Sequence, residues 1–148
     1  MTPELYTDIF DRFQQDSVRY VVISGAAVVL HGFARPIADL DIVVDPAPAE
    51  ADRAMMSLMN VGFFSSIPLP LSMVSVLRMF DSLSREVDVF VRYRLPFEDL
   101  WTNSVLMTVG SSVARVASLD DLLTAKRLVG RPHDLSDVEG LMAIDDDS

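Results

Sequence analysis

The stretch Ala38-Asp39-Leu40-Asp41-Ile42-Val43-Val44 carries two acids inside an otherwise apolar run. Its residue types predict a strand over Leu40–Val44, and residues two apart on a strand point to the same side. Asp39 and Asp41 would then lie side by side, where two carboxylates repel and where burial of either is unfavourable without a positive charge. A divalent cation supplies that charge, and hard oxygen ligands favour Mg²⁺ or Mn²⁺. The alternative is an edge strand with one solvated face.

A second acidic strand is predicted further along the chain, from Glu86 to Tyr93. Its Asp88 stands between aliphatic neighbours, and a third carboxylate beside the first two would complete a site for one or two metal ions of the phosphoryl-transfer type. Glu86 would share the same side of the strand, either as a further ligand or as a charge at the rim. Taken alone, Asp88 is also explained as a solvent-facing strand residue.

The turn before the paired acids has features that suit phosphate binding. Tyr20–Ile23 is a short apolar strand, Ser24-Gly25 interrupts it, and a short helix is expected from Ala26 to Leu30. Glycine lets the backbone approach a ligand closely, and a helix N-terminus offers free N–H groups to a phosphate. Because strand-to-helix turns often contain a glycine, Gly25 alone is weak evidence for phosphate binding. The evidence is stronger because this turn comes shortly before the paired acids.

The remaining elements alternate between helices and strands. Apolar periodicity and cap residues predict helices at 3–17, 49–60, 96–102, 118–129 and 134–143, strands at 76–80, 105–109 and 113–116, and a loop or lid at 63–74. This order predicts one α/β (α+β) domain over residues 1–148, a mixed β-sheet flanked by helices. The C-terminal helices would occupy about 118–143, and residues 145–148 would form an acidic tail.

The composition excludes several classes of protein. Half of the 148 residues are hydrophobic, which excludes disorder over most of the length, and the absence of cysteine excludes disulfides and thiolate chemistry. A net charge of −10 argues against a broad basic surface that coats nucleic acid, whereas action on one nucleic-acid end needs only a local basic rim. Arg92 and Arg94 would supply that rim or simply be solvated. We expect no membrane span, no secretory signal and a cytoplasmic location.

Several motifs follow one another in an order found in a known family. They are Ile23-Ser24-Gly25-Ala26-Ala27, His31-Gly32, Arg35, Asp39-Leu40-Asp41 and Val87-Asp88-Val89. Together they resemble the minimal nucleotidyltransferases of the DNA polymerase β-like superfamily, and more narrowly the AbiEii-type toxin nucleotidyltransferase group. The segments 117–123, 126–127, 130–132 and 134–137 look like the closing helices of that group. Two residues depart from the family pattern, because Ser24 replaces its first glycine and Ile37 replaces a frequent threonine.

The resemblance implies an NTP-dependent enzyme with three catalytic carboxylates. Asp39, Asp41 and Asp88 would hold Mg²⁺ or Mn²⁺, and Asp88 would also help to deprotonate the acceptor hydroxyl. In-line attack on the α-phosphorus of an NTP such as ATP would transfer a nucleoside monophosphate and release pyrophosphate. Ser24 and Gly25 would contact the phosphates.

Two basic residues are further candidates for nucleotide binding. Arg35 would reach a phosphate or pair with a neighbouring aspartate, and Lys126 would contact the phosphates or lie exposed on its helix. His31 is expected to be a satisfied residue at a helix end. Asp134 and Asp137 are expected to cap and salt-bridge the last helix.

The acceptor and the partners stay open at this level. The acceptor would be a hydroxyl of a protein, of a tRNA 3′ end or of a small molecule such as an antibiotic, and toxin–antitoxin modules in the resembling group suggest an antitoxin or another partner protein. The alternative function is a catalytically weak or inactive binding partner that keeps the fold, which the replacements Ser24 and Ile37 support. The apolar residues 63–64 and 69–73 would cover the site or pack against a second copy in a homodimer.

Overall fold

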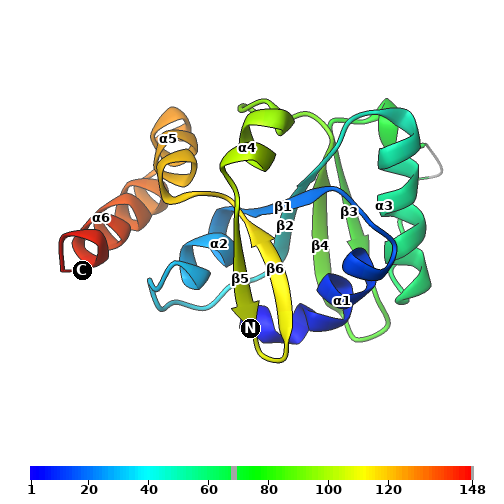
Figure 1. Cartoon of the computed structure of the whole chain (residues 1–148), viewed down its shortest axis with the longest axis horizontal. Helices are drawn as coiled ribbons and strands as arrows, with labels where there is room; N and C mark the ends of the chain where they lie inside the picture. Colours follow the sequence, from blue (N-terminus) through cyan, green and yellow to red (C-terminus); the bar gives the residue numbers. More distant parts are fainter. Residues whose placement is uncertain (68–69, 148) are drawn as a thin grey trace.

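The computed structural model describes residues 1–67 and 70–147, and its centre is a six-stranded mixed sheet in the order β3-β4-β2-β1-β6-β5 (Figure 1). The strands are β1 (Tyr20–Ile23), β2 (Leu40–Val44), β3 (Val76–Phe80), β4 (Glu86–Phe90), β5 (Val105–Val109) and β6 (Ser112–Val116). Strand β2 runs parallel to β4, and β1 runs parallel to β6, whereas the other neighbours are antiparallel. The predicted mixed sheet is therefore confirmed.

Helices flank this sheet, as the sequence predicted. They are η1 (Pro3–Tyr6), α1 (Thr7–Gln15), α2 (Ser24–Leu30), α3 (Pro48–Asn60), η2 (Leu71–Met73), α4 (Phe97–Asn103), α5 (Leu119–Val129) and α6 (Pro132–Asp147), where η marks a 3₁₀ turn. Helix α1 packs on β6 and α3, while α2 packs on β1, β2 and α5. Helices α5 and α6 stand together at one end of the molecule and α3 at the other (Figure 1). None of the helices in the described ranges is long and apolar enough to cross a membrane.

The strands beside the acids separate apolar from charged side chains by simple alternation. In β4, Val87 and Val89 are fully buried while Asp88 between them is half-buried. In β3, Leu77 and Met79 are buried in the same way on either side of an exposed arginine. The buried residues join one core with side chains of α1 and α3. The alternation therefore leaves the charged side chains of both strands on the opposite side of the sheet.

Some predicted boundaries were wrong. The helix expected at 3–17 begins as the 3₁₀ turn η1, and the Thr2 side chain makes no capping hydrogen bond. Strand β4 ends at Phe90 rather than Tyr93, because the next two backbone N–H groups turn to donate to the carbonyl of Ser75. Helix α2 begins two residues earlier than expected and α3 one residue earlier. Residues 63–74 include a bridge between Phe64 and Phe80 and the turn η2.

The C-terminal helices follow their local signals closely. The Ser118 hydroxyl accepts a hydrogen bond from the N–H of Asp121 at 3.1 Å and caps α5, and Gly130 ends that helix with φ at +69°. Helix α6 runs from 132 to 147, so it is longer than the predicted 134–143. Of the expected acidic tail, the side chains of 145–147 and the whole of Ser148 lie outside the described residues, as do Pro68 and Leu69 of the predicted loop.

Candidate active site

Three aspartates meet where β2 lies beside β4. The parallel register sets Asp41 opposite Asp88, and Asp39 stands immediately before β2. One carboxylate oxygen from each of these residues lies within 4.8 Å of the other two. The three carboxylates that the sequence singled out are therefore brought into one cluster, with each side chain half-buried.

The electrostatics of this cluster fit a divalent cation. Oδ1 of Asp41 is buried and has no hydrogen-bond partner in the part of the chain that the structure describes, although buried polar atoms are nearly always partnered. Burial and the neighbouring Asp39 and Asp88 raise the pKa of Asp41 to about 7. Burial, followed by the charge of Asp88, raises the pKa of Asp39 as well. A divalent cation would relieve this repulsion, and a set of carboxylate oxygens suits Mg²⁺ or Mn²⁺.

Arg78 is the main residue of the site that sequence reasoning missed. It lies on β3 directly opposite Asp88, to which its Nε donates at 2.8 Å and its Nη2 at 2.9 Å. Nη2 also lies 3.4 Å from Asp39, and Nη1 lies 3.6 Å from Glu86. Glu86 is thus a rim charge paired with Arg78. The signal available in the sequence was a single base alternating with apolar residues on the predicted strand 76–80.

The start of α2 lies beside the carboxylates. Ser24 has φ at +55°, a left-handed conformation that favours glycine. A Cβ built on Gly25 would stand 3.0 Å from Nη2 of Arg35, so the missing side chain makes room for that guanidinium. Ser24 and Gly25 line a cavity of about 290 Å³ together with Asp39 and Asp41. The turn that the sequence predicted for phosphate therefore opens onto the same space as two of the acids.

Arg35 and Lys126, the two predicted nucleotide-binding bases, line this cavity as well. Arg35 pairs with Asp137 on α6 through two hydrogen bonds of 2.9 Å, and among the described residues it forms no ion pair with the aspartates near it in sequence. Lys126 is only 8 % exposed at its side chain, so the interpretation as an exposed helix residue was wrong. Its Nζ lies 3.0 Å from Asp137 and 3.4 Å from Asp134. Two buried acids of α6 thus hold two cations at the cavity wall.

Other predicted residues have structural contacts. Asp134 accepts a hydrogen bond from the backbone N–H of Arg131 at the start of α6, which confirms its capping role. His31 is the C-terminal cap residue that follows α2, with Nε2 2.8 Å from the carbonyl of Ala117, as expected for a satisfied helix-end histidine. Ile37, which replaces the family's threonine, is 5 % exposed and forms an apolar part of the cavity wall.

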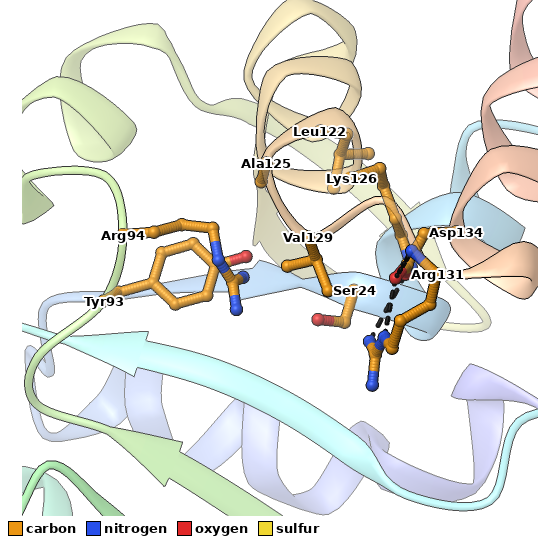
Figure 2. Close-up of a pocket in the computed structure, with 9 residues that line it drawn as sticks. All are labelled: Ser24, Tyr93, Arg94, Leu122, Ala125, Lys126, Val129, Arg131 and Asp134. Carbon is orange, nitrogen blue, oxygen red and sulfur yellow. Dashed lines mark hydrogen bonds and ion pairs between the residues drawn. The ribbon is translucent and has the colours of Figure 1, made fainter.

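A smaller pocket of about 20 Å³ adjoins the cavity, and the two share Ser24, Lys126 and Arg131. Figure 2 shows Tyr93 and Arg94 on one side of it and the apolar side chains of α5 on the other. The Arg94 guanidinium lies 4.5 Å from the centre of the Tyr93 ring. Within the described residues, Arg94 has no carboxylate at ion-pair distance, and its side chain lines this pocket.

The comparisons with known proteins identify the fold. No family model and no curated protein matches the chain in sequence. Its structure is similar to that of a nucleotidyltransferase candidate, TM1012, from Thermotoga maritima, with a TM-score of 0.67 at 17% identity over 97% of this chain and 96% of that one. It is equally similar to the lincosamide antibiotic adenylyltransferase LnuA in its lincomycin-bound crystal structure, with a TM-score of 0.66 at 18% identity over 97% and 98%.

A third similar structure is an antigenic nucleotidyltransferase-like protein from Paracoccidioides brasiliensis, with a TM-score of 0.66 at 16% identity over 95% of this chain and 74% of that one. Together these structures show that the chain has the nucleotidyltransferase fold. The narrower resemblance to the AbiEii-type group stays a prediction.

Proposed function

We propose that this protein is a metal-dependent nucleotidyltransferase that moves a nucleoside monophosphate from an NTP to a hydroxyl group. The observation that carries the proposal is the buried Oδ1 of Asp41, which has no hydrogen-bond partner in the described part of the chain and lies within a cluster of three carboxylates. A purely structural acid at this position would be expected to have a hydrogen-bond partner. The nucleotidyltransferase fold around the cluster supports the same reaction class.

The cavity beside the cluster is the proposed site of the triphosphate. Its wall contains Ser24 and Gly25 at the start of α2 and the positive side chains of Arg35, Lys126 and Arg131. An anionic chain of phosphates would gain favourable electrostatic interactions with these three cations, which are already held in place by the acids of α6. The cations are thus oriented before the nucleotide arrives.

In the proposed reaction Asp39, Asp41 and Asp88 would hold one or two Mg²⁺ or Mn²⁺ ions, which neutralise phosphate charge and stabilise the attacking and leaving oxygens. Asp88 would accept the proton of the acceptor hydroxyl. The acceptor oxygen then forms a bond to the α-phosphorus, the bond from that phosphorus to the oxygen of the β-phosphate breaks, and pyrophosphate leaves.

The acceptor in this proposal is a hydroxyl of a protein, an RNA end or a small molecule. LnuA, named as an antibiotic adenylyltransferase, provides an example of a small-molecule acceptor on the same fold. The motif resemblance to toxin nucleotidyltransferases supports a protein or tRNA acceptor, with an antitoxin as partner. Arg92 and Arg94, both exposed in the turn after β4, would suit an acceptor that carries phosphates.

A second candidate function is a non-catalytic binding partner with the same fold. Arg78 favours it, because a guanidinium that permanently neutralises Asp88 and Asp39 would leave the carboxylates without a catalytic task. Such a protein would bind a partner protein and ignore nucleotides.

A thermal shift experiment separates the two functions. The purified protein is melted with each of the four NTPs, with and without Mg²⁺, beside the double variant Asp39→Asn/Asp41→Asn. A ligand that binds only the folded state raises the melting temperature in proportion to the logarithm of its saturation. A Mg²⁺-dependent rise in the wild type that is lost in the double variant supports the enzyme. The absence of a rise with every nucleotide favours the binding partner.

A further inference from the structure

We propose that Arg78 is a positioning residue that holds Asp88 in the cation-free protein and is displaced from it when a divalent cation binds. The inference rests on the metal site of the proposed function. In this inference the Asp88 carboxylate binds the Arg78 guanidinium when no cation is present, and it binds the metal ion once the cation has entered the site. Arg78 would thereby set the cation concentration at which the three carboxylates become available.

The first support is that Arg78 uses both oxygens of Asp88. Nε and Nη2 contact Oδ1 and Oδ2 at 2.8 and 2.9 Å in a two-point pair, which is the strongest geometry for guanidinium and carboxylate. The same Nη2 extends to Asp39 at 3.4 Å, so the positive charge lies between two of the three acids. A divalent cation bound by these oxygens would repel a guanidinium held at this distance.

The second support is that Arg78 neutralises the cluster on one side only. Its ion pairs are with Asp39, Asp88 and Glu86, and none with Asp41 is found among the described residues. Oδ1 of Asp41 remains buried and has no hydrogen-bond partner among the residues that the structure describes. The negative charge of Asp41 is therefore not neutralised by Arg78, which contacts the cluster from β3. A small cation bound between the three carboxylates would neutralise it.

The third support is that the Arg78 side chain can move away from Asp88 toward solvent and toward an alternative partner. Its side chain is 51 % exposed, so it can swing toward solvent without breaking core packing. Glu86 lies two residues before Asp88 on the same side of β4, with Oε2 already 3.6 Å from Nη1 of Arg78. A short rotation of the guanidinium would exchange Asp88 for Glu86 as its principal partner. The displaced arginine would then stay at the rim of the site.

The test is a calorimetric titration with Mn²⁺ alone, without nucleotide. The variant Arg78→Gln should bind Mn²⁺ with a Kd roughly two- to fivefold lower than that of the wild type, the upper part of the range expected for removing one partly exposed competing ion pair. Arg78→Lys keeps the charge but loses the two-point geometry, so its Kd should fall between the two. The matched control is Arg53→Gln on α3, an exposed arginine that lies 3.7 Å from Glu50 and on a different element from the three carboxylates. It changes the net charge equally and should leave the Kd within about a factor of two.

A double-mutant cycle with Glu86→Gln tests whether Arg78 changes its partner from Asp88 to Glu86 when the cation binds. Loss of the alternative partner should weaken Mn²⁺ binding when Arg78 is present and have a smaller effect in the Arg78→Gln background. Equal effects in both backgrounds would contradict the exchange with Glu86.

The outcomes distinguish this inference from the proposed function. If Asp41→Asn loses Mn²⁺ binding while Arg78→Gln binds as the wild type does, or more weakly, the metal site stands and the role of Arg78 is refuted. If neither the wild type nor Arg78→Gln binds Mn²⁺, the metal site and the inference both fail. Circular dichroism of each variant shows that the fold is kept, and Arg78→Lys provides the comparison if Arg78→Gln does not fold.

Discussion

The substitution Asp41→Asn should stabilise the cation-free protein while it removes metal binding. Burial and two neighbouring carboxylates raise the pKa of Asp41 from 3.8 to about 7. Between these two pH values the folded protein binds more protons than the unfolded chain, so the stability of the cation-free protein falls as the pH rises through this window. Above pH 7 the ionised Asp41 opposes folding in full.

The size of the effect follows from the same two values. A difference between 3.8 and about 7 corresponds to about 4 kcal/mol of unfavourable free energy above pH 7. Asparagine removes the charge, but its amide is incompletely hydrogen-bonded at this position, and this cost offsets part of the stabilisation. We therefore expect a net stabilisation of about 1–3 kcal/mol. For a chain of this length that is a rise in melting temperature of roughly 3–10 °C.

The assay is a melting curve at pH 8 and at pH 5, with EDTA and with Mn²⁺. At pH 5 most of the folded wild type carries a protonated Asp41, so the advantage of the variant should fall to less than half. Mn²⁺ should raise the melting temperature of the wild type and leave that of the variant unchanged. The control Asp52→Asn, an exposed acid on α3, should change neither curve. A variant that melts at or below the wild-type temperature at pH 8 in EDTA would refute the reasoning.

Three further changes test other parts of the site. Ser24→Gly should relieve a left-handed backbone and raise the free energy of unfolding by up to about 1 kcal/mol, with the nucleotide-dependent thermal shift retained; a drop in urea midpoint would argue against strain at this position. Asp88→Asn should keep nucleotide binding but slow pyrophosphate release by about a hundredfold or more, and an unchanged rate would remove Asp88 from the mechanism. Asp137→Asn deprives Lys126 and Arg35 of their shared buried partner, so urea unfolding should show a loss of about 2–4 kcal/mol, whereas a loss below about 0.5 kcal/mol would mean that both cations find other partners.

Much of the fold could be predicted because its signals are local. The β-branched runs mark the central strands, and the capping serine and the terminal glycine mark α5 almost to the residue. The spacing of Asp39 and Asp41 on a strand places them together whatever lies around them. The mixed sheet and the choice of the three carboxylates therefore followed from short stretches of sequence.

The partners of the charged residues depended on the tertiary structure. Asp88 meets Asp41 because β4 pairs in parallel with β2, and it meets Arg78 because β3 is the next strand in the sheet. Arg35 reaches Asp137 across more than a hundred residues of sequence. The sequence alone determined which residues carry charge and which strands they occupy, because periodicity and caps act within a few residues. Only the tertiary structure decided which charges neutralise one another and which oxygen stays unpartnered, because electrostatic contacts depend on distance in space.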